Sequence, residues 1–528
     1  MAGAIVSSDV KRRGWGGVWL VVVLYLLVTA WLSFHLNVWR DEMYSLHTSS
    51  GSVGRAARQG ILFELQPPVY FAALAAWRTL GDSIFFARLL SSLFGAGAVL
   101  VIARIADRWV PRVRPAYAAA LLASHPFLIW AGTEIRVYAL VILLSALLTL
   151  AFLEAYWRPE PSRRARLMFA GVALVSLYTQ FYLSLLLVCF GVALLARRGR
   201  PSLWAYVVDA GAVMALSLPL VLALRAQFAS HRGDLGRQVG IGVETLRLVV
   251  ARFEAYLFSF NDAIDQARWS LPAMRAARWA YRALIFATIG VGLVLFRRKV
   301  RDSLPSARPE TGSLAEAWPF VAAITTYAVC MAGIVVAVGP MSVGARHTAG
   351  LLVPALLAVT AAPAVALGRS AAVSWVAILV ASNVAATTLV QFVPLAKDCD
   401  CRRVAEAITE HEASREPILI FPSEDVMPLA VYYHGKNHLV PVPSAPSYEH
   451  WDQSTFVIRS PDDVADALVK EAPGGVGLWV HTNTYGPGWG PEKLEAFLAH
   501  GFREDQKYEF AHGVVLRHFV PGDLSAAQ

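Results

Sequence analysis

The sequence predicts a polytopic α-helical membrane protein with about eleven transmembrane helices and a small α/β domain at its C-terminal end. Of its 528 residues, 56% are hydrophobic and only 16% are charged, whereas soluble proteins carry about 25% charged residues. Apolar stretches of roughly 17–25 residues, the length that crosses the hydrocarbon core of a bilayer, recur along the first three quarters of the chain. From Lys397 onward the stretches stop and the composition becomes that of a soluble domain.

The spans follow from apolar length, and their direction follows from the charges of the loops. Positively charged loops stay in the cytoplasm, so Lys11–Arg13 places the N-terminus inside and the first span leads outward. With that start, every short basic loop falls on the same side of the membrane. The expected spans are Trp15–Leu36, Arg88–Arg104, Pro115–Gly132, Val137–Trp157, Leu167–Gln180, Phe181–Ala196, Leu203–Leu224, Trp279–Phe296, Trp318–Val338, Thr348–Leu367 and Ala372–Phe392.

Two outer loops are too long to be simple turns. Residues 37–87 contain PPVYFAALAAWRTLG, an apolar piece whose length suits a re-entrant or interfacial helix better than a span. Residues 225–278 contain VETLRLVVARFEAYLF, with apolar residues on one helical face and charged residues elsewhere, as in a helix lying on a membrane surface. Together with these loops, residues 1–396 form the predicted membrane domain.

Residues 397–528 are predicted to form a soluble α/β domain outside the membrane. EPILIF, GVGLWVHT and GVVLRHFV are typical of buried strands, whereas CRRVAEAITEHEA, SPDDVADALVKEA and GPEKLEAFLAHG are typical of amphipathic helices. Such alternation favours an α/β arrangement, and no glycine-rich phosphate loop follows the strands. Cys399 and Cys401 lie two positions apart, a spacing that is awkward for a mutual disulfide.

The net charge of +9 hides an uneven distribution. From Lys397 to Gln528 the chain has about 11 Lys and Arg and about 20 Asp and Glu, roughly −9, so the membrane part holds about +18. The basic residues are scattered over short loops and form no continuous stripe, which argues against nucleic acid as a partner. No Cys or His spacing typical of a metal site is present.

The predicted topology gathers polar residues on the outer face. Ionisable residues at membrane depth are functional candidates by default, although a solvated loop explains each of these taken singly, and acids in a helix's first turn are also favourable there. Arg88, at the start of a span, is interpreted as reaching toward the headgroups. The outer-face residues are Asp41, Glu42, Glu64, Gln66, Glu134, Arg136, Arg346 and His347.

The chemistry available on the outer face of a membrane limits which substrates an enzyme there can use. Cytosolic nucleotide sugars and ATP are absent there, so a sugar donor must arrive attached to a lipid. A polyprenyl-phosphate-sugar already carries a good leaving group, and its transfer needs a cation at the phosphate, for which the Arg fork is well matched. The acceptor hydroxyl needs a base, and a positioned carboxylate can take its proton.

Four motifs, in this order, resemble those of the GT-C glycosyltransferases, which include protein O-mannosyltransferases and lipid A aminoarabinose transferases. RDEMYSLH resembles the Asp-Glu-x-x-Tyr motif of the family's first outer loop, and FELQPPVYFAALAAWRTLGDSIFFARLL is similar to its Pro-Pro helix block. GTEIRVYAL is similar to an acid-x-Arg-x-Tyr motif, and ARHTAGLLVPALLA to a late Arg element. The resemblance covers roughly residues 1–400 and implies a GT-C-like membrane fold.

The resemblance implies a role for each motif residue. Asp41 would be the general base, Glu42 its orienter or local charge, and Arg346 with His347 the binding site for the lipid phosphate. Gln66 stands where relatives often carry a basic residue, and His347 stands where they often carry Tyr. The substrate-binding positions would be Tyr44, Glu64, Gln66, Glu134, Arg136, Tyr138, Arg346 and His347.

The resemblance also implies inversion at the anomeric carbon in a single displacement. No metal is required by many members of the family; a divalent cation held by Asp41, Glu42 and Glu134 is the open alternative for a cofactor. The predicted protein is a hexosyl- or pentosyltransferase of the inner (plasma) membrane, with a cytoplasmic N-terminus, an extracytoplasmic C-terminal domain, and a glycan, lipid or protein hydroxyl as acceptor.

Two other functions stay open. A lipid-linked-sugar transporter or flippase would show inverted repeats and spans broken near the midplane, and no convincing repeat is found. A non-catalytic assembly partner with a decayed site is the second alternative.

Overall fold

The structure is a computed structural model of the chain, in which two compact units are distinguished. The helical unit comprises Met1–Phe34 and Leu65–Val393, and the second unit comprises His35–Glu64 and Pro394–Gln528. Apart from five isolated positions in 243–283, the described residues are 2–110, 113–158, 162–196, 200–223, 318–338, 345–366, 369–448, 453–471, 477–483 and 489–522.

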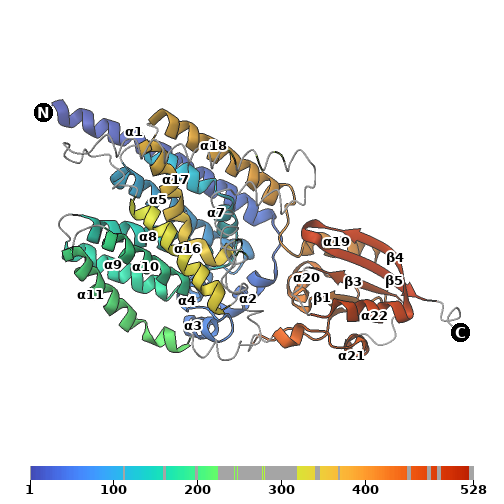
Figure 1. Cartoon of the computed structure of the whole chain (residues 1–528). Coiled ribbons are helices and arrows are strands. Elements are labelled where there is room, and N and C mark those ends of the chain that lie inside the picture. The colour runs from blue at the N-terminus through green and yellow to red at the C-terminus, as the bar shows by residue number, and fades with distance from the viewer. Residues whose placement is uncertain are drawn as a thin grey trace. The chain divides into compact units, whose positions relative to one another are not determined.

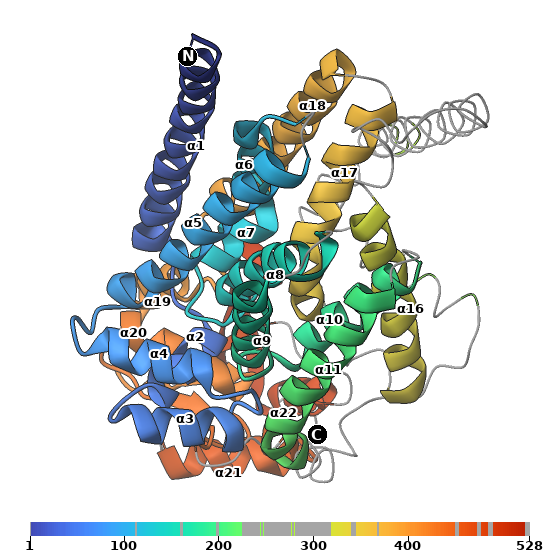
Figure 2. The same cartoon turned by 90° about the vertical axis from the view of Figure 1, so that its left-hand side faces the viewer.

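The helical unit is built almost entirely from apolar helices (Figure 1, Figure 2). Its core helix α5 packs against α8, α6 and α7, while α16 packs against α10 and α17. The helices are α1 (Ala2–His35), α4 (Val69–Arg78), α5 (Ile84–Trp109), α6 (Pro115–Ala123), α7 (Pro126–Gly132), α8 (Tyr138–Phe152), η1 (Leu153–Trp157), α9 (Arg163–Leu177), η2 (Phe181–Leu183), α10 (Ser184–Ala196), α11 (Arg200–Leu216), α16 (Trp318–Val338), η4 (Ala345–Leu351), α17 (Leu352–Ala366), α18 (Arg369–Thr387) and η5 (Thr388–Phe392).

Among the described residues, four helices are long and apolar enough to cross a membrane: Trp15–His35, Ile84–Trp109, Tyr138–Trp157 and Ala372–Phe392. Shorter apolar helices cover Phe181–Leu195, Ser202–Leu216, Ala323–Val336 and Arg346–Ala361. The predicted multi-pass helical membrane protein is therefore confirmed, whereas the count of eleven spans stays a prediction. The expected span Trp279–Phe296 and most of the loop 225–278, with its surface helix, lie outside the described residues.

One predicted span is divided in two. Residues 115–132 form α6 and α7, with a break at Ser124 and His125 just before Pro126, which has no N–H to donate. The His125 ring nitrogen Nδ1 accepts a hydrogen bond from the Phe127 amide at 3.2 Å, and the Asn383 side chain donates to the Leu121 carbonyl at 3.3 Å. Broken helices are tolerated at membrane depth when neighbouring groups satisfy the freed backbone in this way.

The second unit contains a five-stranded mixed sheet in the order β2-β1-β3-β5-β4. Strands β1, β2 and β3 are parallel, and β5 runs antiparallel to its neighbours β3 and β4. The central position of β1 and β3 makes them the most enclosed strands, and every residue of β1 is buried. The strands are β1 (Ile418–Phe421), β2 (Leu439–Pro441), β3 (Leu478–Thr482), β4 (Phe502–Glu509) and β5 (Val515–Pro521).

Helices cover both faces of this sheet. On one face α19 (Cys401–His411) and α20 (Val426–Tyr432) pack against alternate residues of β1 and against Trp479. On the other face α21 (Pro461–Glu471) and α22 (Pro491–Gly501) pack against the remaining residues of the same strands. The short helices α2 (Arg40–Thr48) and α3 (Val53–Leu62) belong to this unit although they precede it by more than 300 residues.

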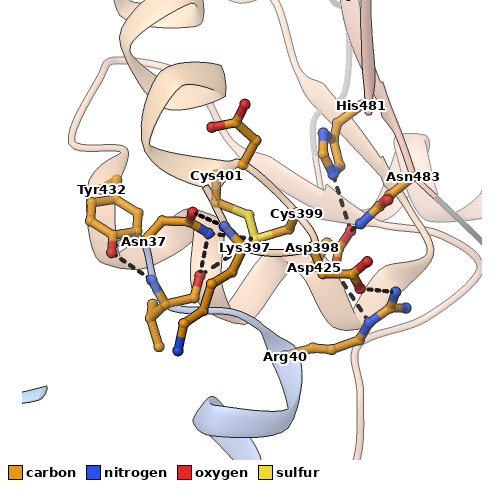
Figure 3. Close-up of a disulfide and its surroundings, with 12 residues drawn as sticks. Asn37, Arg40, Lys397, Asp398, Cys399, Cys401, Asp425, Tyr432, His481 and Asn483 are labelled. Carbon is orange, nitrogen blue, oxygen red and sulfur yellow. Dashed lines mark hydrogen bonds and ion pairs between the residues drawn. A yellow bond between two sulfur atoms is a disulfide. The ribbon is translucent and has the colours of Figure 1, made fainter. Parts of the chain in front are cut away.

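Cys399 and Cys401 form a disulfide (Figure 3), so the expectation from their spacing was wrong. The bridge lies where the chain enters α19. It belongs to a short segment, residues 397–401, that also supplies the Lys397 and Asp398 side chains described below.

Candidate functional site

The adjacent acids Asp41 and Glu42 lie in the first turn of α2, immediately after the first long apolar helix. Acids are favourable at this position because the exposed amides of a helix's first turn carry partial positive charge. The helix is not held by a side-chain cap at Trp39. What else holds it in place determines what its two carboxylates can do.

Glu42 is fully buried and ion-paired. Its Oε1 lies 2.8 Å from Nζ of Lys397, and the side chains are 0% and 5% exposed respectively. A carboxylate enclosed in this way has no open face for a substrate. Glu42 is therefore an internal ion-pair partner of Lys397, and the catalytic role expected for it from the sequence stays a prediction.

Asp41, in contrast, is only half-buried. Positions 41, 45 and 48 fall on one face of a helix because they are spaced by four and three residues. Ser45 and Thr48 donate from this face to Oε1 of Glu64, at 3.5 and 3.4 Å. Asp41 and Glu64, two of the predicted site residues, thus border the same face of α2.

Arg40, which the sequence reasoning missed, reaches Asp398 and Asp425 (Figure 3) and a third carboxylate, Glu424. Its guanidinium nitrogens lie 2.7 Å from Asp398 Oδ2, 3.7 Å from Glu424 Oε2 and 4.0 Å from Asp425 Oδ1. Glu424 Oε1 also accepts a hydrogen bond at 2.5 Å from the hydroxyl of Tyr44, the third predicted site residue in α2. The residues Arg40, Tyr44, Asp398, Glu424 and Asp425 are called the Arg40 cluster below.

The Arg40 cluster stands at the carboxyl ends of the two central strands. Glu424 and Asp425 follow β1, while His481 is the last residue but one of β3 and Asn483 follows that strand. Asp425 Oδ2 accepts from Asn483 at 2.8 Å and contacts His481 Nε2 at 3.2 Å. Ligands of open α/β sheets commonly bind at this edge, but here the edge is occupied by side chains of the same unit.

The charges in the Arg40 cluster shift one another's protonation. Burial raises the pKa of Glu424 to about 7, because it outweighs the lowering by the Arg40 charge and the Tyr44 hydrogen bond; the charges of Asp41 and Asp425 add smaller raising contributions. Burial also raises the pKa of Asp425, but the Arg40 charge and the bonds from His481 and Asn483 outweigh it, so the net direction is downward. Asp425 is thus held ionised, whereas Glu424 titrates near neutral pH.

The pKa values of Arg40 and Tyr44 are both shifted upward. Burial lowers the pKa of Arg40, but the three carboxylates outweigh burial and the net shift is upward. Burial, together with the Glu424 charge, raises the pKa of Tyr44. Arg40 therefore stays cationic and the Tyr44 hydroxyl stays a proton donor over the physiological range.

In the helical unit, Glu134, Arg136 and Tyr138 are buried around the turn that leads into α8. Tyr138 stacks on Trp130 with ring centroids 5.1 Å apart. Arg88 is also buried, 1% exposed, and donates to the Ser33 carbonyl at 2.8 Å. The interpretation of Arg88 as a residue extending to the headgroups was wrong, and it joins the enclosed ionisable residues of this unit.

Arg346 is exposed on η4, and its neighbour His347 stacks on Tyr182 with centroids 5.3 Å apart. The Ser145 hydroxyl of α8 donates to the Gly350 carbonyl at 2.5 Å, which ties η4 to α8. Because η4 packs against α8, the Arg346 motif lies beside the helix that begins with Tyr138.

Gln66 lies at the same end of the helical unit. The Val69 amide, which opens α4, donates to the Tyr178 carbonyl at the end of α9, at 3.1 Å. Tyr182 follows four residues later and carries the stacked His347. Because α8 and α9 pack as an antiparallel pair, the start of α8 and the end of α9 share this end, so the motifs of Gln66, Tyr138 and His347 converge there.

Across the described residues, no group of three or more His, Cys, Asp or Glu side chains is arranged to hold a metal ion. Glu42, one of three carboxylates considered for a divalent cation, is engaged by Lys397.

A scan of protein-family models finds no match to this chain, and no curated protein matches it either. Among solved structures it is similar to ArnT from Cupriavidus metallidurans. The apo state has 17% identity and a TM-score of 0.42, covering 96% of this chain and 98% of that one. The structure bound to undecaprenyl phosphate has 14% identity and a TM-score of 0.37, covering 95% and 98%.

Proposed function

We propose that this protein is an inverting glycosyltransferase that moves a sugar from a polyprenyl-phosphate donor to an acceptor hydroxyl on the outer face of the membrane. The observation that supports the proposal is that two adjacent acids differ in burial. Glu42 is buried and neutralised by Lys397, while Asp41 stays half-exposed on a helix that directly follows the first membrane helix. A base must be both fixed and reachable, and Asp41 combines the two.

The remaining motifs supply what a lipid-linked donor needs. Arg346 is exposed at the end of the helical unit where the motifs of Gln66 and Tyr138 also converge. An exposed guanidinium suits the phosphate of an amphiphilic donor. The buried Glu134 and Arg136 fit the sugar end of the donor, where enclosed polar groups set orientation.

In the proposed reaction each of these residues has one role. Asp41 accepts the proton of the acceptor hydroxyl while the hydroxyl oxygen forms its bond to the anomeric carbon. On the opposite side, the bond between that carbon and the phosphate oxygen breaks, and the electron pair leaves with the lipid phosphate. Arg346 stabilises the added negative charge on the phosphate. A single displacement from the opposite face inverts the configuration at the anomeric carbon.

The test is transfer by purified protein from a panel of radiolabelled polyprenyl-phosphate sugars to acceptors in membrane extracts. We expect labelled product with the wild type and a loss of at least about 100-fold in Asp41→Asn, the usual scale for removing a general base. Asp107→Asn is the matched control, because Asp107 lies at the end of α5 beside Arg104, on a loop predicted to be cytoplasmic.

Full activity of a correctly inserted Asp41→Asn protein would overturn the base assignment. Movement of intact donor across a vesicle membrane, without formation of any new glycosidic bond, would replace the transferase by the flippase alternative.

A further inference from the structure

The segment that leads into α2 is held at every step by the C-terminal part of the second unit. Arg402 donates to the His35 carbonyl at 2.9 Å, and the Tyr432 hydroxyl accepts from the Val38 amide at 2.7 Å. The Asn37 side chain accepts from the Lys397 amide at 2.7 Å. Residues that are about 360 apart in sequence thus fix the path of the chain before α2 begins (Figure 3).

Two charged anchors then hold the first turn of α2 itself. The first is the Arg40 cluster, in which Arg40 and Tyr44 contact carboxylates of the C-terminal segment. The second is the pair of Glu42 and Lys397. Both anchors are largely removed from water, with Arg40 14% exposed and Glu42 not exposed at all.

The two anchors contact opposite sides of α2. Successive residues of an α-helix are about 100° apart around the axis, so Arg40 and Tyr44 lie on one side and Glu42 lies about 160° from Tyr44. Asp41 falls between them, about 60° from Tyr44 and about 100° from Glu42. A helix held on two sides cannot roll about its axis, and its rotation decides where the Asp41 carboxylate points.

The supports of these anchors are rigid. Glu424 and Asp425 follow the buried central strand β1, and Asp425 is held in turn by His481 and Asn483 at the end of β3. Lys397 and Asp398 come from the short segment closed by the Cys399–Cys401 disulfide. Each anchor therefore connects α2 to the sheet domain.

We infer that the C-terminal sheet domain is a positioning part of the transferase site: through Lys397, Asp398, Glu424 and Asp425 it fixes the rotation of α2 and thereby aims Asp41. The inference rests on the proposed function, since Asp41 needs aiming only if it acts on a substrate. It assigns to the domain a role in the chemical step, in place of guiding acceptors or merely covering the outer loops.

The experiment compares steady-state kinetics of anchor variants in the full-length protein. Glu42→Gln/Lys397→Met removes both charges of one anchor, so no unpaired charge stays buried and the protein is expected to fold. We expect kcat to fall about 10- to 100-fold while the donor KM changes less than about twofold, because misaiming the base affects the chemical step and leaves donor binding intact.

A second pair of variants separates aiming from stability. Arg40→Lys keeps the charge and should retain most of kcat, whereas Arg40→Gln should lose it to the same extent as the double variant. Arg517→Gln is the matched control, because Arg517 pairs with Glu495 at 2.5 Å and joins β5 to α22. Its kcat should equal that of the wild type.

The outcomes are distinguishable. If the wild type and Arg517→Gln transfer sugar and the folded anchor variants retain kcat within twofold, the positioning role is refuted and the proposed function stands. A parallel rise in donor KM in all anchor variants also refutes it, in favour of a general loosening of the site. If the wild type transfers no sugar from any donor, the proposed function fails and the inference falls with it.

Discussion

Glu424 makes the sheet domain sensitive to pH, and Glu424→Gln should remove that sensitivity. Burial, with the charges of Asp41 and Asp425, raises the pKa of Glu424 from an ordinary 4.5 to about 7. The folded state therefore holds this proton more tightly than the unfolded chain between those two values. Stability from this group is complete below about pH 4.5 and is lost as pH rises through 7.

The size of the effect follows from the same values. Each tenfold difference in proton affinity is worth about 1.4 kcal/mol, so the whole change across the window is about 3 kcal/mol. Between pH 6 and pH 8 the loss is about 1.3 kcal/mol, or about tenfold in a local opening equilibrium. Asp425, whose pKa is lowered, changes charge below this range and does not contribute to it.

Hydrogen–deuterium exchange in the full-length protein measures this directly. Amides of 418–425 and 478–483, which flank the Arg40 cluster, should exchange about tenfold faster at pH 8 than at pH 6 after correction for the intrinsic rate. In Glu424→Gln, whose amide oxygen can still accept from Tyr44, the corrected rates should be equal at the two pH values. His47, whose pKa burial and the Arg55 charge lower, contributes equally to both proteins and cancels.

Equal corrected rates in the wild type at pH 6 and pH 8 would refute this reasoning. So would the same pH dependence in Glu424→Gln, because another group would then be responsible for it.

Three further outcomes are expected. Arg346→Ala should raise the donor KM about tenfold or more and leave insertion intact, as measured by steady-state transfer; an unchanged KM and kcat would move the phosphate site elsewhere. Gly490→Ala should destabilise the sheet domain by about 1–3 kcal/mol, because Gly490 has φ +80° and a Cβ there would meet the Ile458 carbonyl oxygen at 2.1 Å; thermal unfolding checks it, and an unchanged midpoint contradicts it. Cys399 and Cys401 should resist thiol labelling in intact cells until a reductant is added, since disulfides persist in oxidising compartments; labelling without reductant would argue against an extracytoplasmic sheet domain.

Much of the sheet domain could be predicted from sequence because its buried strands consist of continuous apolar runs. EPILIF and GVGLWVHT read as strands because β1 and β3 lie in the middle of the sheet and are covered on both faces. The missed strand β4 is an edge strand with mostly exposed residues, so its sequence FREDQKYE carries no apolar signal. The missed β2 has only three residues and ends in a proline.

The candidate site was predictable only in part, for a different reason. The position of Asp41 and Glu42 after the first span was visible, because a carboxylate pair beside an apolar helix stands out. Their partners were not, since Lys397 lies 355 residues from Glu42 and nothing in a single sequence pairs charges over that distance. The Cys399–Cys401 bridge was missed because its spacing argued against it.

The difference in burial between Asp41 and Glu42 follows from helix geometry. Neighbouring residues on a helix point about 100° apart, so when one is turned into a core the next is left at its border. Glu42, turned inward, must be neutralised, because an unpaired buried carboxylate costs several kcal/mol, and Lys397 meets this need. Asp41 then stays near water on a helix that cannot turn. An adjacent acid pair is thus a simple way to obtain one anchor and one reactive group, provided that a distant part of the chain supplies the cation.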